Sequence, residues 1–190
     1  MEALLGIFSA FGLSASAGLN AYIPLLVIGV VDHYFPTVLN LTKPWDLIAH
    51  PWILILLGVL VIIEMLADKV PAVNHVNDII QTVIRPAAGA IVFAASANVI
   101  TDVHPVIALA CGLLVSGSVH VAKSAVVRPV VTATTGGAGN IPVSIAEDII
   151  STVVSILAIV LPIIMAILLV ILFVLIYLWW AGRKDKQQTA

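Results

Sequence analysis

The chain has 190 residues, of which only 9% are charged and 62% are hydrophobic, and its formal net charge at pH 7 is -2. A soluble domain carries about 25% charged residues, so this composition excludes a water-soluble globular protein. The lack of a basic block gives no reason to expect a nucleic-acid partner. We therefore predict an all-α polytopic membrane helix bundle, with about five transmembrane helices in a single domain over residues 1–190.

The first predicted span covers residues 3–31, which contain no Asp, Glu, Lys or Arg. About 20 apolar residues suffice to cross the hydrocarbon core. The small residues of GLSASAGLNAYIP would let neighbouring helices approach closely, and Asn20 and Pro24 would loosen the helix about midway. Two interpretations stay open here: a tight packing face, or a partly unwound segment that lines a cavity.

The second and third predicted spans carry ionisable side chains. Glu64 and Asp68 lie four residues apart and therefore share one face of the second span. In the third span, Asp78 and Arg85 are seven residues apart on one face, and Pro86 predicts a kink. Ionisable residues at membrane depth are costly, and they indicate a functional site by default.

The fourth predicted span, residues 104–123, brings His120 and Lys123 onto one face. The charge-free run 149–182 would measure about 51 Å as one helix, which exceeds the thickness of a membrane, so we predict a break at Pro162. Aromatic residues and a basic tail, residues 181–190, would close the last span at the interface.

Two segments of the chain, residues 50–101 and 104–180, resemble each other and predict an internal two-helix repeat in parallel orientation. Chance alignment of apolar helices is the alternative. The second copy carries an insertion, TATTGGAGN. The matched pairs are His50-Pro51 with His104-Pro105, Gly58 with Gly112, Lys69 with Lys123, Pro71 with Pro142, and Asp78 with Asp148.

The insertion lies in a stretch, residues 123–148, that combines charges with glycine-rich backbone. Its Gly-Gly-Ala-Gly-Asn run would let backbone amides approach a ligand, and Ser144-x-x-Glu147 reads as a capping box at a helix start. We expect a re-entrant or unwound segment that holds an anion or a polar head group. An ordinary exposed turn is the alternative. The predicted substrate-binding residues are Asn20, Arg85, Lys123, Arg128, Thr134, Thr135, Gly136, Gly137, Gly139, Asn140 and Ser144.

Both copies of the repeat carry their charges at the same end of their helices, so these charges would meet in one vestibule. The alternative is a set of ordinary interfacial charges and snorkelling anchors. The candidates for proton coupling are Glu64, Asp68, Asp78, His120, Glu147 and Asp148.

The runs TTGGAGNIPVSIAED, GLNAYIPLL and ADKVP resemble a family of small bacterial integral membrane proteins that is described as a domain of unknown function. The resemblance covers most of the chain, and its Gly-Gly-x-Gly-Asn-x-Pro-x-Ser-x-x-Glu-Asp pattern is fairly specific. It implies a multi-pass protein of the bacterial cytoplasmic (inner) membrane and no particular activity.

The functional expectation is a small transporter or channel, in which acids take up protons while bases and the glycine run contact a polar or anionic solute. A structural or lipid-binding membrane protein without transport is the alternative. We expect a homo-oligomer and no cofactor, metal or enzymatic activity, since histidines with ligand spacing and nucleophile motifs are lacking. The basic residues divide equally between the two faces, which leaves orientation open and permits dual topology.

Overall fold

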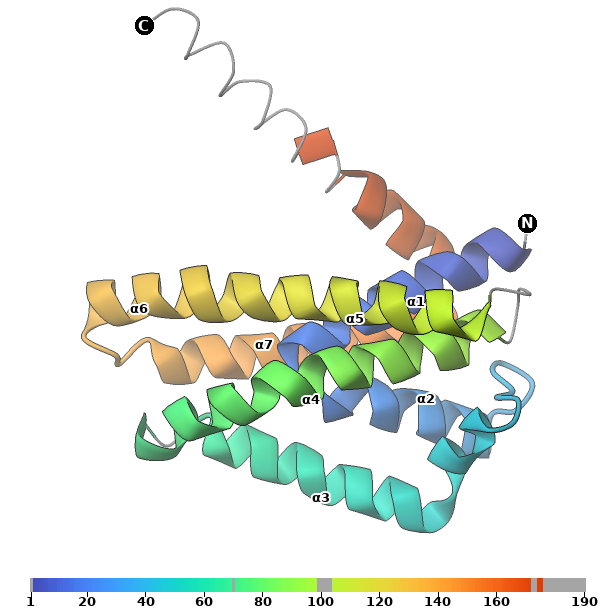
Figure 1. Ribbon diagram of the computed structural model, residues 1–190, viewed down its shortest axis with the longest axis horizontal. Helices are drawn as coiled ribbons and strands as arrows, with labels where there is room; N and C mark the ends of the chain where they lie inside the picture. The colour runs from blue at the N-terminus through green and yellow to red at the C-terminus, as the bar shows by residue number, and fades with distance from the viewer. Residues whose placement is uncertain (1, 70, 99–103, 172–173, 176–190) are drawn as a thin grey trace, which may run out of the picture.

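The computed structural model describes residues 2–69, 71–98, 104–171 and 174–175 (Figure 1). Within these ranges the chain is helical or irregular and contains no strand, which confirms the predicted all-α membrane bundle. The elements are α1 (Glu2–Leu19), α2 (Tyr22–Tyr34), the 3-10 helix η1 (Trp45–Ala49), α3 (Pro51–Ala67), α4 (Pro71–Asn98), α5 (Pro105–Ala122), the π-helix η2 (Lys123–Val127), α6 (Arg128–Thr135) and α7 (Asn140–Val160).

The bundle has the surface of a membrane protein. Three helical stretches of the described chain are long and apolar enough to cross a bilayer, namely Ile79–Ala97, Pro105–Thr135 and Asn140–Val160, and α3 is a shorter apolar helix. Large aliphatic side chains are exposed along α3, α5 and α7, whereas most of the serines and most of the ionisable side chains of these helices are buried. Lipid is as apolar as leucine, so this inverted distribution is the stable one in a bilayer.

The first predicted span is wrong as a continuous helix. The helix stops at Leu19 and starts again at Tyr22. Figure 1 shows that α2 turns back near the middle of the bundle and runs toward the side from which α1 began. The chain reverses because Asn20 breaks the helix, and Pro24, which has no amide to donate, fits the first turn of a new helix. We call α1 and α2 the re-entrant hairpin.

Small residues set the distance between α4 and α5. A β-carbon on Gly89 would collide with the side chain of Ser116, and one on Gly112 would collide with the backbone of Gly89. Ser116 also donates from Oγ to the carbonyl of Arg85 at 2.7 Å. Close backbone approach of this kind is the usual way in which helices pack in lipid.

The long apolar run after residue 148 is interrupted as predicted. Helix α7 ends at Val160, Leu161 leaves helical geometry with φ -134° and ψ 62°, and a new helix begins at Pro162. Proline cannot donate the amide bond that would continue α7. The basic tail and its neighbouring tryptophans, residues 176–190, lie outside the described residues.

The helix order is compatible with the predicted duplication, which stays a prediction. Both α3 and α5 begin with a proline that follows a histidine. The two helices run in the same direction, and each is followed by a helix that returns, α4 and α7 respectively (Figure 1). The insertion TATTGGAGN, residues 132–140, forms the end of α6 and the turn before α7, while η2 and α6 extend α5.

Candidate functional site

The site forms around the break between α1 and α2 in the re-entrant hairpin, at Asn20 and Ala21, which we call the gap. The end of α1 exposes the Leu19 carbonyl, to which the Lys123 ammonium donates at 3.1 Å. The start of α2 exposes the Ala21 amide, which donates to the Glu64 carboxylate at 3.2 Å. A cation therefore holds the negative end of one helix dipole, and an anion holds the positive end of the next.

Asn20 connects the gap to α7. Its Oδ1 accepts from the amides of Tyr22 and Ile23, both at 3.1 Å, and thereby caps the first turn of α2. Its Nδ2 donates to Asp148 Oδ1 at 3.0 Å. The cap of α2 is therefore bonded directly to a buried carboxylate.

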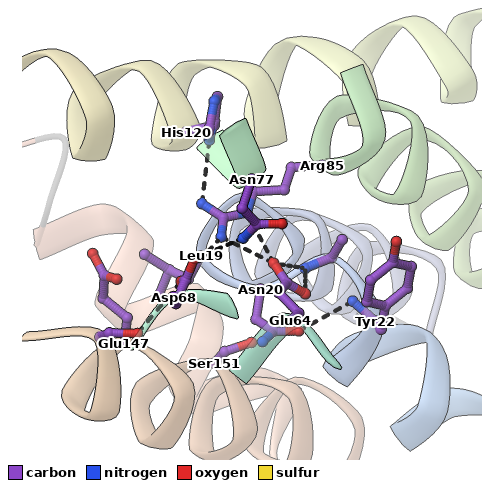
Figure 2. Close-up of polar contacts among 12 residues, drawn as sticks. Leu19, Asn20, Tyr22, Glu64, Asp68, Asn77, Arg85, His120, Glu147 and Ser151 are labelled. Atoms are coloured by element: carbon purple, nitrogen blue, oxygen red, sulfur yellow. Dashed lines mark hydrogen bonds and ion pairs between the residues drawn. The ribbon is translucent and has the colours of Figure 1, made fainter. Parts of the chain in front are cut away.

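Arg85 lies at the centre of the site, between Glu64 and His120 (Figure 2). Its side chain is 0% exposed, and its Nη2 lies 2.9 Å from Glu64 Oε1 and 3.6 Å from Asp68 Oδ2. Its Nη1 lies 3.3 Å from His120 Nδ1. An arginine can only donate, so Nδ1 accepts and the ring proton of His120 sits on Nε2, which lies 3.1 Å from the Thr82 hydroxyl.

Asp68 is the most shared carboxylate of the site. Its Oδ2 lies 3.0 Å from Arg128 and 3.7 Å from Lys123. Its Oδ1 accepts from Asn77 at 2.8 Å, and Ser144 Oγ donates to Oδ2 at 3.4 Å. This single carboxylate thus draws α4, η2, α6 and α7 toward the end of α3.

The π-helix η2 explains how two bases from one short segment of the chain both reach the site. Lys123 and Arg128 are five residues apart, a spacing that does not share a face in an α-helix. In η2 the amide of Arg128 donates to the carbonyl of Lys123, five residues earlier, and both side chains meet Glu147, at 2.7 Å and 3.6 Å. Such π-turns are frequent at functional sites.

We call the buried acids Glu64, Asp68, Glu147 and Asp148, with the buried bases Arg85, Lys123 and Arg128, the ion network. Taking an ion out of water costs several kcal/mol even after relaxation, and only well-formed pairs compensate for this cost. The network has four acids and three bases, and Lys69 at its edge, 4.0 Å from Asp148 Oδ2, supplies the fourth positive charge.

Three cavities reach the ion network from outside. One of about 450 Å³ lies below the turn between α6 and α7 and is lined by Asp68 and Lys69 together with that turn; we call it the vestibule. A second, of about 230 Å³, lies between α3 and α7 and reaches Asp148. A third, of about 500 Å³, lies between α4 and α5 and reaches His120.

The glycine-rich run is not the re-entrant element that the sequence led us to expect. It forms the turn between α6 and α7 at one end of the bundle (Figure 1), where Gly136 and Gly137 have positive φ values of 62° and 91°. The Thr134 and Thr135 hydroxyls donate to backbone carbonyls of α6, and the Gly139 amide donates to the Thr135 hydroxyl. The glycines reverse the chain, and the threonines stabilise the turn; binding of an anion by this run stays a prediction.

The turn nevertheless contributes to the site. Gly136, Gly137 and Asn140 line the vestibule. Asn140 donates from Nδ2 to the Thr132 hydroxyl at 2.9 Å, and within the described chain its buried Oδ1 has no hydrogen-bond partner. The turn therefore shapes the entrance to the vestibule and lies apart from the ion network.

The predicted capping box is also wrong. Helix α7 begins at Asn140, so Ser144 and Glu147 lie inside it, one and two turns from its start. Both side chains are buried and face the ion network instead of the helix terminus. The side chain of Asp78, a predicted proton-coupling residue, lies outside the described residues.

Sequence reasoning missed the polar backbone of the gap and a serine seam. Ser16 Oγ lies 2.7 Å from the hydroxyls of both Ser151 and Ser155, which joins α1 to α7. The seam could be read from the spacing of Ser151 and Ser155, four residues apart on one face of an apolar helix. The Leu19 carbonyl and the Ala21 amide have no sequence signal beyond Asn20 and Pro24, which predict only that the helix is loosened there.

No group of three or more His, Cys, Asp or Glu side chains in the described part of the chain could hold a metal ion. Residues 7–182 match the sequence profile of a family described as "Domain of unknown function (DUF4126)". This match confirms the family resemblance drawn from the sequence. No curated protein and no solved structure matches the chain.

Proposed function

The chain belongs to the family described as Domain of unknown function (DUF4126), and we propose that it is a small membrane transporter of polar or anionic solutes, coupled to protons. We place it in the cytoplasmic membrane of a bacterium, as the resemblance implies. Catalysis forms no part of the proposal.

The observation that carries the proposal is the gap in the re-entrant hairpin. Transporters build solute and ion sites from discontinuous helices, whose amide ends face anions and whose carbonyl ends face cations. In this chain the two ends are occupied by side chains, Glu64 on Ala21 and Lys123 on Leu19. Side-chain ions can exchange with a solute, whereas a continuous helix would offer no such ends.

The nature of the solute follows from the groups near the vestibule. Lys69 lines it, and Arg128 and Lys123 lie behind Asp68, which also lines it. An anion that enters the vestibule competes with the Asp68 carboxylate for the Arg128 guanidinium, which favours planar, bidentate oxyanions. Asp68 then loses a positive partner, and proton uptake by a carboxylate of the ion network restores the charge balance.

A structural role without transport is the second candidate, because one observation favours it. Arg85, Lys123 and Arg128 each lie within 3.0 Å of a carboxylate oxygen. A network in which these three buried bases already have carboxylate partners can serve folding alone. The two candidates therefore predict different results in a transport assay, because only a transporter moves protons or solute across a membrane.

The test uses the full chain reconstituted in liposomes under an inward proton gradient. The probes are radiolabelled acetate, lactate, glutamate and inorganic phosphate, with a pH-sensitive dye inside the liposomes. We expect proton-dependent uptake of at least one anion. Arg128→Gln should lower this uptake by about tenfold, the loss expected for one charged hydrogen bond.

The matched control is Lys43→Gln, which removes a base from the exposed loop between α2 and η1 and should leave uptake unchanged. Circular dichroism of each variant checks that it is folded. If folded wild-type protein moves neither protons nor any of the four anions, transport is refuted and the structural role stands.

A further inference from the structure

Asp148 is the carboxylate of the ion network that is least satisfied. Its side chain is 5% exposed, and Oδ1 accepts one hydrogen bond from Asn20. Within the described residues no group donates a hydrogen bond to the buried Oδ2. A buried carboxylate oxygen without a donor is costly, so it indicates a place where something else binds.

Asp148 lines the cavity between α3 and α7, and the other residues of this lining indicate what binds there. Apart from Asp148 and Lys69, the cavity is lined by Thr152 and by apolar residues, namely Met65, Ile145, Ile149 and Val153. The Thr152 hydroxyl already donates to the carbonyl of Asp148. Metal cations such as Ca²⁺ or Mg²⁺ need about six oxygen ligands, whereas a proton needs a single oxygen.

The charged groups that act on Asp148 come from the end of α3 and from η2. They are Asp68, Lys69 and Lys123. Lys123 is bonded to Glu147 at 2.7 Å, and Asp68 is held by Arg128 at 3.0 Å. The Lys69 ammonium differs from these groups in being farther from its carboxylate. It donates to the Met65 carbonyl at 3.0 Å and lies 4.0 Å from Asp148 Oδ2.

Lys69 also lies between two cavities. It lines the apolar cavity that contains Asp148, and it lines the vestibule. Its side chain is 31% exposed, whereas the lysine of η2 is 3% exposed. A long, flexible side chain in this position can place its ammonium in either cavity without a change in the helices.

We propose, on the basis of the transport function proposed above, that Asp148 is the proton-binding carboxyl of the transporter and Lys69 its tethered counter-cation. With the ammonium beside Oδ2, Asp148 is ionised. When the ammonium moves into the vestibule, a proton from the water there binds Oδ2 and replaces the lost positive charge. Oδ1 keeps its hydrogen bond to Asn20, and Asn20 caps α2. The exchange of ammonium for proton therefore changes the carboxyl group to which the cap of α2 is bonded.

The test is infrared spectroscopy of the full chain in lipid nanodiscs, titrated with pH in the absence of any solute gradient. We expect a carboxylic-acid C=O band that titrates in the wild type and is lost in Asp148→Asn. The asparagine keeps an oxygen for Asn20, so this variant should fold. Asp46→Asn, in η1 and outside the ion network, should leave the band in place.

Lys69→Met carries the test independently of Asp148→Asn. Loss of the ammonium favours the protonated carboxyl, so the band should titrate roughly one pH unit higher, a tenfold change in proton affinity. Lys43→Met, in an exposed loop, should not move it. An unchanged midpoint in Lys69→Met, or an unchanged band in Asp148→Asn, overturns the proposal.

The proton-site proposal and the transport proposal are refuted by different outcomes. If the band behaves as expected but the liposomes show no flux, the proton site stands and the transport function falls. If flux is present and Asp148→Asn neither alters it nor removes the band, transport stands and Asp148 is not the proton site.

Discussion

The Glu64 and Arg85 pair gives the sharpest prediction about the ion network. Both side chains are at most 1% exposed, and two nitrogens of the guanidinium, Nε and Nη2, lie 3.2 Å and 2.9 Å from Glu64 Oε1. Removing one partner of a buried ion pair costs about 3–5 kcal/mol, because the other charge is left in a low dielectric. Glu64→Gln leaves Asp68 at 3.6 Å from Arg85, so we expect a loss near the lower limit, about 3 kcal/mol.

The assay is equilibrium unfolding of the purified chain in mixed micelles, followed by circular dichroism. Combining Glu64→Gln with Arg85→Gln should recover part of the loss, because two neutral amides can bond to each other. Contacting residues couple by about 0.5–3 kcal/mol. Asp46→Asn, in η1, is the control and should stay within about 0.5 kcal/mol of the wild type.

One result would refute this reasoning. If Glu64→Gln costs less than about 1 kcal/mol and the double variant is no more stable than the single one, the carboxylate is solvated by water. The pair would then be an ordinary interfacial contact.

Three further predictions use the same unfolding assay. Gly89→Ala should destabilise the protein by about 1–3 kcal/mol, because its new β-carbon collides with α5. Gly58→Ala is the control and should be neutral or stabilising, because nothing lies within 4 Å of its new atom. Equal effects of the two substitutions would contradict the close packing of α4 and α5. Asn20→Ala should cost about 1–2 kcal/mol through the lost cap of α2, and no loss would show that α2 does not start there. Ser16→Ala should cost about 1 kcal/mol, whereas the exposed Ser118→Ala should cost nothing measurable, and a reversed order would rule out the serine seam.

The sequence was sufficient to locate the ion network because charges are rare in this chain. Glu64 and Asp68 share a helix face, as their spacing of four residues requires, and both are buried together in the structure. The break at Pro162 was also predictable, since proline cannot continue a helix of that length.

The reversal of the first helix was not predictable from its own residues. An uncharged run over residues 3–31 satisfies every criterion for a span. What stabilises the gap lies far along the chain, namely Glu64 in α3 and Lys123 in η2. The place of the glycine-rich turn at the end of the bundle was not predictable for a different reason: the same composition suits an exposed turn and a re-entrant segment, and only the helices around it decide between them.

The account depends most directly on the re-entrant hairpin, which a labelling experiment can test. In a Cys111→Ala background, single cysteines are placed at Ile7 in α1, at Tyr34 at the end of α2, and at Ala138 in the turn between α6 and α7. They are then labelled in sealed vesicles with a membrane-impermeant thiol reagent. The structure predicts that positions 7 and 34 react from one face and position 138 from the other. If positions 7 and 34 react from opposite faces, the first helix crosses the membrane and the gap that organises the ion network does not exist.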